Sequence, residues 1–110
     1  MGVGEMGGSA TLVRGRHVAI RDWRALADAG AVGNMNTRFF DAEGRSVGGL
    51  EDRTVAISWA DLRGIATVIA VAAGASKVAA LDGALRTRCV DILITDEPTA
   101  LRLVASRSGR

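Results

Sequence analysis

Aromatic side chains are scarce in this chain of 110 residues, which has two tryptophans, two phenylalanines and no tyrosine. Proteins that bind single-stranded nucleic acid stack bases on aromatic rings, so the composition argues against such a surface. The formal net charge is only +2. The arginines are spread along the chain, whereas DNA-binding proteins gather their basic residues in a patch or stripe. The composition therefore gives no indication of a nucleic-acid partner.

Cysteine and histidine occur once each, as Cys89 and His17. A single cysteine cannot form an internal disulfide, and Cys89 stands at the entry to an apolar stretch. This predicts a buried free thiol in a reducing, cytoplasmic compartment. One histidine and one distant cysteine are too few ligands for a zinc site, and a Ser/His/Asp triad would have to use His17 without a nucleophile elbow. We expect neither a metal nor a cofactor.

Long apolar runs are also missing from the sequence. No window approaches the roughly 18 apolar residues that span a bilayer. The opening residues 1–8 lack the charged and apolar regions of a signal peptide. We therefore expect no membrane partner and a cytoplasmic location.

The spacing G-x-G-x-x-G occurs once, at Gly2, Gly4 and Gly7. A dinucleotide site also needs a strand before this motif and a helix after it. No strand can be assigned before Gly2, and Gly7-Gly8-Ser9 is a poor helix start. The motif therefore does not predict a nicotinamide cofactor.

The strongest pattern is an apolar run that ends at Gly74 and changes at once into a helical periodicity. The run predicts a buried strand over residues 67–72. One apolar stripe predicts a helix over residues 77–86. The stripe consists of Val78, Leu81, Ala84 and Leu85.

A second strand is predicted at residues 90–95, and Asp96 and Pro98 then open a last helix. Aspartate caps helices and proline suits their first turn. The order strand, helix, strand, helix predicts an α/β fold with two adjacent parallel strands and a right-handed crossover.

The first two thirds of the chain give weaker signals. Residues 1–19 and 106–110 have no regular pattern, and Phe39 and Phe40 are expected in the core. The expected elements are a helix over 23–29 capped by Asp22 and closed by Gly30, a hairpin of 34–41 with 45–47 around Glu43–Gly44, a strand over 54–58, and a short helix or turn over 59–64.

Lys77, the only lysine, follows Gly74 at the start of the predicted helix. Ligands of open α/β sheets bind beyond the carboxyl ends of the strands, and a helix N-terminus there favours an anion. Gly74 lets the backbone approach an anion closely, and Lys77 adds a full positive charge. The alternative is a solvated lysine in the first helical turn, although a cation there is opposed by the helix dipole.

Residues 30–44, GAVGNMNTRFFDAEG, resemble the block GAVGD-x-x-G-x-FFD-x-x-G of the SorC/DeoR-type sugar-binding transcriptional regulators. The match covers roughly residues 30–104, and Gly2-Val-Gly4 resembles the end of an upstream GIG strand. Further blocks follow in the family's order: residues 57–63 resemble its I-x-x-x-x-L helix entry, residues 68–81 its VI-x-VAGG-x-x-K-x-x-AI, residues 84–86 its ALR, and residues 92–100 its LITDE-x-TA.

The resemblance implies a partial Rossmann-like parallel sheet of the glucosamine-6-phosphate deaminase and ribose-5-phosphate isomerase type. It implies that residues 1–110 are the carboxyl-terminal part of a sugar-binding effector domain and do not form an enzyme. The implied partners are a phosphorylated sugar and further copies of the regulator in a homo-oligomer. DNA would be contacted only by a helix-turn-helix that this chain does not contain, and a glycine/threonine phosphate loop is also expected outside it.

The sequence departs from the family block at two positions. Asn34 stands where the family has an acidic residue, and Thr37 stands where it has glycine. The amide of Asn34 can both donate to and accept from sugar hydroxyls, and the Arg38 guanidinium can bind phosphate in a fork. The expected effector-binding residues are Lys77, Asn34, Arg38, Gly74 and Asn36. The alternatives are a turn role for Asn34 and a solvated strand position for Arg38.

Two other classes of function are also compatible with the sequence. One is an isomerase- or deaminase-like enzyme on the same fold, which needs a general base near the sugar. Asn34 cannot serve as that base, although Lys77 can form a Schiff base with an open-chain sugar. The other is an interaction segment that joins full-length homologues through their oligomer surface without binding a ligand.

Overall fold

A computed structural model describes residues 1–7, 15 and 18–108. Within them the chain forms a four-stranded antiparallel sheet and a two-stranded parallel sheet. The elements in chain order are β1 (Gly4–Glu5), α2 (Ile20–Asp28), β2 (Ala31–Met35), β3 (Arg38–Asp41), β4 (Ser46–Val47), α3 (Trp59–Arg63), β5 (Ile69–Val71), α4 (Val78–Arg86), β6 (Ile92–Ile94) and α5 (Glu97–Ser108), with 3₁₀ turns at Glu51–Arg53 and Ala75–Lys77.

The predicted parallel pair is confirmed. β5 and β6 pair in parallel, with Ile69 opposite Ile92 and Val71 opposite Ile94, and α4 lies between them in the chain. Both strands are shorter than their apolar runs. The last helix also begins as predicted, because the Asp96 carboxylate accepts the Thr99 backbone N–H at 3.0 Å.

The antiparallel sheet has the order β1-β2-β3-β4. β2 and β3 form a hairpin around Asn36 and Thr37, whose φ angles are +51° and +63°. Positive φ at both central residues is typical of a type I′ turn. Treating residues 34–41 as a single arm was therefore wrong, because a turn lies inside this segment. The predicted return of the chain at Glu43–Gly44 is confirmed, since β4 pairs with β3 after it.

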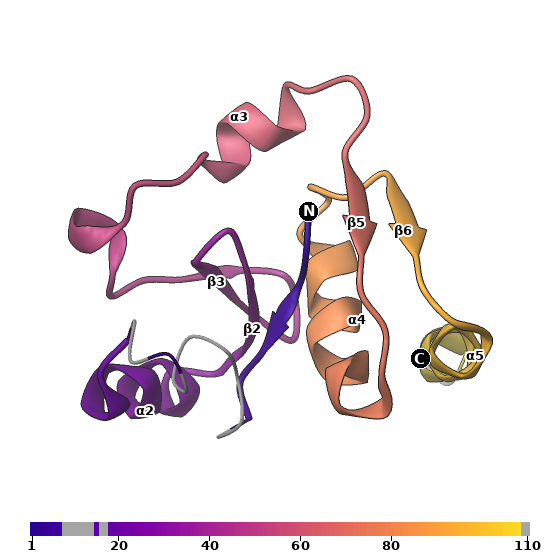
Figure 1. Cartoon of the computed structure of the whole chain (residues 1–110), viewed down its shortest axis with the longest axis horizontal. Coiled ribbons are helices and arrows are strands. Elements are labelled where there is room, and N and C mark those ends of the chain that lie inside the picture. Colours follow the sequence, from indigo (N-terminus) through magenta and orange to yellow (C-terminus); the bar gives the residue numbers. More distant parts are fainter. Residues whose placement is uncertain (8–14, 16–17, 109–110) are drawn as a thin grey trace.

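Residue Met1 joins the two sheets (Figure 1). Its nitrogen donates to the Ile69 carbonyl at 2.8 Å, and its carbonyl accepts from the Val71 N–H at 2.8 Å. One donated and one accepted bond on either side of Ala70 is the pattern of a parallel strand. Residues 1–3 therefore run beside β5 and lead directly into β1, in agreement with the resemblance of Gly2-Val-Gly4 to the end of a strand, whereas the expectation of an irregular segment is wrong for Gly4–Glu5.

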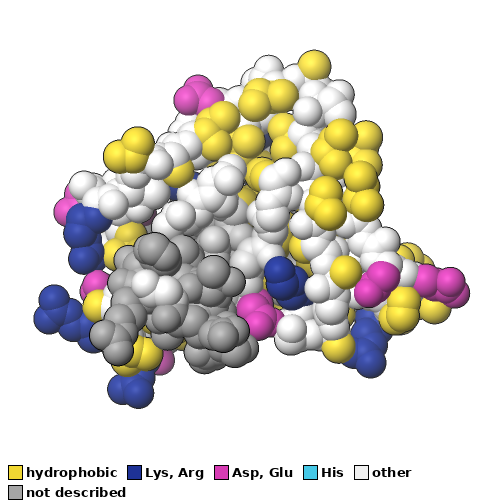
Figure 2. Space-filling model, in the orientation of Figure 1, with side chains coloured by type: hydrophobic (Ala, Val, Ile, Leu, Met, Phe, Trp, Pro, Cys, Tyr) yellow, Lys and Arg dark blue, Asp and Glu magenta, His cyan; other side chains and the backbone are white. Residues whose placement is uncertain are grey.

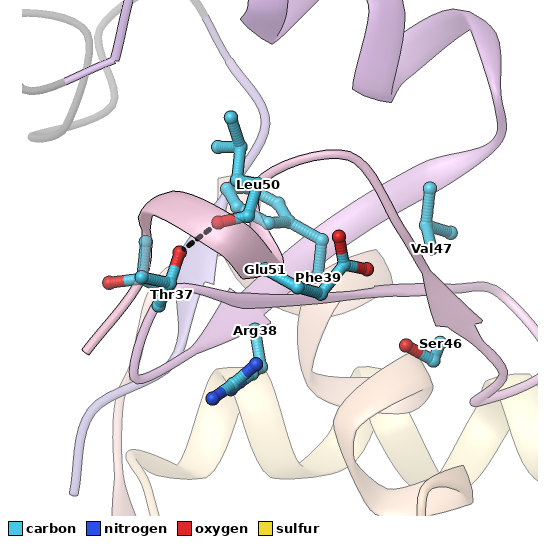
Figure 3. Close-up of a pocket in the computed structure, with 8 residues that line it drawn as sticks. Thr37, Arg38, Phe39, Ser46, Val47, Leu50 and Glu51 are labelled. Carbon is cyan, nitrogen blue, oxygen red and sulfur yellow. Dashed lines mark hydrogen bonds between the residues drawn. The ribbon is translucent and has the colours of Figure 1, made fainter. Parts of the chain in front are cut away.

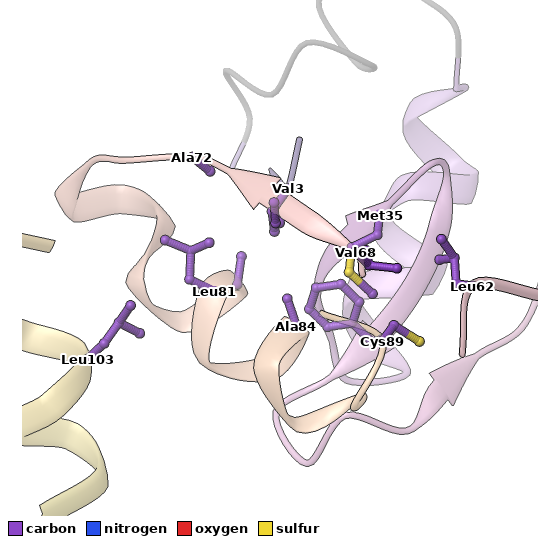
Figure 4. Packing of buried hydrophobic residues seen from close by; sticks show 12 residues of the cluster. Val3, Met35, Leu62, Val68, Ala72, Leu81, Ala84, Cys89 and Leu103 are labelled. Atoms are coloured by element: carbon purple, nitrogen blue, oxygen red, sulfur yellow. The ribbon is translucent and has the colours of Figure 1, made fainter. Parts of the chain in front are cut away.

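Helix α4 packs on one face of the joined sheets and forms the main core (Figure 4). Phe40 and Met35 of the hairpin are fully buried there, together with Leu81 and Ala84 of α4. A Cβ at Gly33 would lie 2.7 Å from the Ala80 Cβ, so glycine permits this close approach. A second cluster around Phe39 and α2 covers the opposite face of the antiparallel sheet. The expected burial of both phenylalanines is confirmed.

The opposite face of the parallel pair is uncovered. Ile69 and Val71 of β5 are 42% and 56% exposed, so the predicted burial of residues 67–72 holds for Val68, Ala70 and Ala72 but not for the residues between them. Ile92 and Ile94 of β6 are similarly exposed. Figure 2 shows these apolar side chains gathered over β5 and β6. We call Ile69, Val71, Ile92 and Ile94 the open sheet face.

Two other predictions are wrong in part or whole. Residues 54–58 form no strand; Val55 is fully exposed, and the Ala56 carbonyl accepts the Arg38 guanidinium at 2.9 Å. Helix α2 begins at Ile20 and not after Asp22, which lies in its first turn. Its end near Gly30, at φ +98°, agrees with the expected glycine stop.

The remaining expectations concern single residues and helix α3. Helix α3 forms as predicted, and Ser58 caps it by accepting the Asp61 N–H at 3.1 Å. Cys89 is a buried free thiol, also as predicted. No helix among the described residues has the length and apolarity that a bilayer crossing requires.

Candidate functional site

Lys77 ends the 3₁₀ turn that connects β5 to α4. Its backbone N–H donates to the Gly74 carbonyl at 3.0 Å. Its side chain is half-buried, and Nζ donates to the Val3 carbonyl at 3.1 Å. Residues 1–3 run parallel to β5, so Lys77 lies just beyond the end of β5 and beside the point where residues 1–3 continue into β1. Lys77 therefore lies at the carboxyl end of the parallel strands, where α/β sheets bind ligands.

Asn34 lies next to Gly4, the residue that follows Val3. It pairs with Gly4 across β2 and β1, and it is only 8% exposed. A Cβ at Gly4 would come 2.6 Å from the Asn34 Nδ2. The structure thus brings Asn34 and Lys77 to two consecutive residues, Val3 and Gly4, although 43 positions separate them in the sequence.

Gly74 has φ +127°, a conformation that favours glycine. Its N–H donates to the Thr99 hydroxyl oxygen at 3.0 Å. A Cβ at this position would meet no atom within 4 Å among the described residues. The turn before Lys77 is therefore held by its backbone and open on the side where a Cβ would project.

Asn36 and Arg38 lie apart from Lys77. Asn36 is exposed in the hairpin turn, with its Nδ2 3.6 Å from the Met1 sulfur. Arg38 is opposite Met35, one pair further along than Asn34, so its side chain leaves the other face of the sheet. Figure 3 shows Arg38 on the opposite side of β3 from Phe39. Arg38 is therefore on the face that α4 covers, with Met35, and Asn34 is on the face of Phe39, so the five expected residues do not form one cluster.

Arg38 borders a small cavity of about 40 Å³ (Figure 3). Its guanidinium donates to the Ala56 carbonyl, while its buried Nε has no partner among the described residues. The pKa of Glu51, in the same cavity wall, is lowered mainly by the Gly49 N–H and also by the charge of Arg38. These contacts explain Arg38 as a residue that fixes the 50–56 segment.

A wider hollow of about 420 Å³ lies beside the other side of the 3₁₀ turn. Neither Lys77 nor Asn34 borders it. Its lining consists of Ala42, Ala75, Ser76, Val78, Ala79, Asp82 and Ser106. Asp82 in this wall forms an ion pair with Arg86 at 3.2 Å within α4 and another with Arg107 at 3.5 Å, which joins α4 to α5.

Metal and triad chemistry find no support in the described part of the chain. No three His, Cys, Asp or Glu side chains lie close enough there to hold a metal ion. His17 lies outside the described residues. Gly4 of the G-x-G-x-x-G spacing is the first residue of β1, so no helix begins inside the motif.

The sequence does not predict two of the residues that contact Lys77 and Gly74, namely Val3 and Thr99. The Val3 carbonyl contacts Lys77 across 74 positions, and no local pattern encodes such a contact. Thr99 reaches Gly74 from the first turn of α5. Its position three residues after Asp96 is the spacing of a helix cap, which indicates a polar contact but not its partner.

Comparisons with known proteins agree with this architecture. Residues 1–105 match the model of the family described as "Putative sugar-binding domain". The deoxyribonucleoside regulator of Bacillus subtilis (strain 168) is 40% identical over 82 residues, which are 74% of this chain and 26% of the regulator. The chain therefore spans about a quarter of that relative's length.

Two solved structures show the same fold. A transcriptional regulator from Streptococcus pneumoniae TIGR4 superposes with a TM-score of 0.87 at 33% identity, over 97% of this chain and 41% of that one. The full-length sorbitol operon regulator SorC from Klebsiella pneumoniae superposes with a TM-score of 0.80 at 26% identity, over 93% of this chain and 33% of the regulator. The α/β architecture and the resemblance to SorC/DeoR-type regulators are confirmed, and the chain belongs to the sugar-binding domain family found in these regulators.

Proposed function

We propose that residues 1–110 are the carboxyl-terminal part of an effector domain that binds a phosphorylated sugar in the cytoplasm. The complete domain would have the glucosamine-6-phosphate deaminase and ribose-5-phosphate isomerase type of fold. It would belong to a homo-oligomeric regulator whose helix-turn-helix, outside this chain, contacts DNA. Sugar binding would then change DNA affinity through a difference in affinity for two states of the regulator.

The observation that carries the proposal is the position of Lys77 and Gly74 directly after β5, with the Lys77 Nζ bound to the Val3 carbonyl, one residue before Gly4, the strand partner of Asn34. An ammonium group has three donor hydrogens. One points to the Val3 carbonyl, the only partner of Nζ among the described residues, which leaves two for a phosphate. The open side of Gly74 provides room for an anion at the backbone. The Asn34 amide supplies donors and an acceptor for sugar hydroxyls.

Binding without turnover fits these groups better than catalysis does. Asn34 has no proton-accepting carboxylate, and isomerase or deaminase chemistry needs a general base. The Lys77 Nζ is engaged by the Val3 carbonyl. We therefore assign the site to recognition, which agrees with the regulator names of the relatives.

Calorimetric titration of the chain with ribose 5-phosphate and glucose 6-phosphate tests the proposal. Each ligand is compared with its unphosphorylated sugar. We expect Lys77→Met to weaken binding of the phosphorylated ligand by roughly ten- to hundredfold, since a charge-assisted hydrogen bond contributes about 1.5–3 kcal/mol. Binding of the neutral sugar should change little, because it offers no charge to lose.

Two variants complete the test. Arg24→Met removes one positive charge from the exposed side of α2 and should leave affinity unchanged. Asn34→Ala should weaken phosphorylated and neutral ligands alike, because its contacts are with hydroxyls. Equal losses of both ligands with Lys77→Met would show that Lys77 does not bind phosphate, and no binding by the unaltered chain would reject the proposed function.

A further inference from the structure

The turn before Lys77 is tied to the start of helix α5 by a buried threonine. Thr99 is 2% exposed, and its hydroxyl oxygen accepts the Gly74 N–H at 3.0 Å across 25 positions of sequence. The Gly74 carbonyl in turn accepts the Lys77 N–H at 3.0 Å. Both polar groups of the Gly74 backbone are therefore engaged, one by Thr99 and one by Lys77.

Asp96 orients this threonine. Its carboxylate accepts the Thr99 backbone N–H at 3.0 Å. The pKa of Asp96 is lowered first by a hydrogen bond from the Thr99 hydroxyl and then by that backbone N–H. A hydroxyl has one proton and two lone pairs. Once its proton points at Asp96, a lone pair remains for the Gly74 N–H.

Gly74 needs such a restraint more than most residues do. Glycine has the widest range of backbone conformations, and φ +127° is one that few other residues adopt. Without a partner for its N–H, the turn could rotate and carry Lys77 with it, because only two residues separate them. The position of the Lys77 side chain therefore depends on the conformation of the turn that begins at Gly74.

We propose that Thr99, oriented by Asp96, is a positioning residue that holds the Gly74 turn in the conformation that presents Lys77 to the sugar phosphate. This inference rests on the proposed function for its ligand, but the restraint on Gly74 can be measured without one. Neither Thr99 nor Asp96 needs to touch the ligand. The network acts through the backbone of the turn.

Isosteric substitution separates positioning from packing. Thr99→Val keeps the shape of the side chain and removes the hydroxyl, whereas Thr99→Ser keeps the hydroxyl. Thr87 is an equally buried threonine whose hydroxyl donates to the Ala84 carbonyl at 2.6 Å, at the other end of α4. Thr87→Val is therefore a matched control that loses a buried hydroxyl far from Gly74 in the sequence.

The first measurement is amide hydrogen exchange of Gly74, followed by NMR in the full chain. We expect Thr99→Val to accelerate exchange of this amide roughly tenfold, while Thr99→Ser and Thr87→Val leave it near the unaltered rate. Global unfolding rates measured on the same samples separate local loosening from lost stability. Unchanged Gly74 exchange in Thr99→Val, or equal acceleration in Thr87→Val, overturns the inference.

The second measurement is titration of the same variants with ribose 5-phosphate and glucose 6-phosphate. We expect affinity to fall roughly tenfold in Thr99→Val and to be restored in Thr99→Ser. Faster Gly74 exchange with unchanged affinity overturns the positioning role while the proposed function stands. Failure of the unaltered chain to bind either sugar phosphate overturns the proposed function, and with it the ligand part of this inference, whatever Gly74 exchange shows.

Discussion

Gly33 and Ala80 hold β2 and α4 at a distance that leaves no room for one further carbon. A Cβ on Gly33 would lie 2.7 Å from the Ala80 Cβ and 2.6 Å from the Gly4 carbonyl oxygen. One neighbour belongs to the helix and the other to strand β1, so neither can move without displacing an element. This contact sets how closely α4 lies over the strands that carry Asn34.

Gly33→Ala should therefore destabilise the chain by about 1–3 kcal/mol, the usual cost of an extra methyl group in a well-packed core. Gly64→Ala is the control, because a Cβ there would meet its nearest atom at an ordinary 3.4 Å and its φ is −79°. Urea unfolding of both variants measures the difference. A Gly33→Ala midpoint equal to that of Gly64→Ala would contradict the close contact.

Thr37→Gly should stabilise the chain. Thr37 has φ +63°, which costs an L-residue roughly 1–2 kcal/mol, and its branched Cβ makes it a poor choice there. The greater freedom of glycine in the unfolded chain offsets about 0.5–1 kcal/mol of the gain. The expected net effect is a gain of about 0.5–1 kcal/mol in the free energy of unfolding, seen as a higher urea midpoint.

Asn36→Gly provides the comparison for this hairpin turn. Asn36 also has positive φ, but asparagine tolerates the left-handed region better than threonine does. Its replacement should therefore raise stability less than Thr37→Gly. A larger gain at position 36 than at position 37 would show that backbone strain is not what limits this turn.

Acid should weaken the β3–β4 hairpin through Asp41. The pKa of this carboxyl is lowered chiefly by the Arg45 backbone N–H, and also by the Arg45 side chain and the Glu43 N–H. Because folding lowers the pKa, the unfolded chain binds more protons in this range. The stabilisation is therefore fully present above the unfolded value of about 3.9 and is lost as pH falls through the folded pKa.

Unfolding curves of the unaltered chain and Asp41→Asn at several pH values measure this effect. The unaltered chain should be the more stable of the two at pH 7, and the difference should shrink as the pH drops below about 3.9. A difference that stays constant down to pH 2 would show that the Asp41 charge contributes nothing to folding.

The open sheet face should promote association between molecules. Large exposed apolar patches lower solubility and mark surfaces that bind other surfaces. Ile92, which is 47% exposed on this face, is the position to change. Sedimentation velocity of Ile92→Lys should show less concentration-dependent association than the unaltered chain does.

Ala79→Lys is the matched control, because it adds the same charge at an exposed position on α4. If both variants reduce association equally, net charge and not the open sheet face is responsible. If neither does, the face is not the surface through which the molecules associate.

Local patterns were sufficient to predict the second half of the fold. The apolar runs of β5 and β6 and the stripe of α4 each carry their own structure, so their order along the chain gave the parallel pair. The prediction of a strand at residues 54–58 is wrong because it rests on the alternation of apolar and polar residues alone. The Arg38 guanidinium donates to the Ala56 carbonyl, and Val55 faces solvent. A side-chain hydrogen bond therefore fixes this segment in place of pairing with a neighbouring strand.

The site could be predicted only in part, for a similar reason. The apolar run before Lys77 is a local signal, and it correctly predicts that Lys77 follows the carboxyl end of β5. The separation of Arg38 from Asn34 depends on a turn without glycine, which shifts the alternation of side chains within residues 34–41. The roles of Val3 and Thr99 depend on contacts between distant segments, which periodicity does not contain.

The strand at residues 1–3 also sets an order of events during synthesis. Its partners on the β5 side, Ile69 and Val71, are made nearly seventy residues later, and Lys77 later still. On the ribosome the first residues must therefore wait, unpaired on that edge, while the hairpin of β2 and β3 can already form beside them. Contacts of such long sequence separation slow folding. The pairing of residues 1–3 with β5 is thus also the step that brings Val3 to Lys77, and it must follow synthesis of the β5–α4 segment.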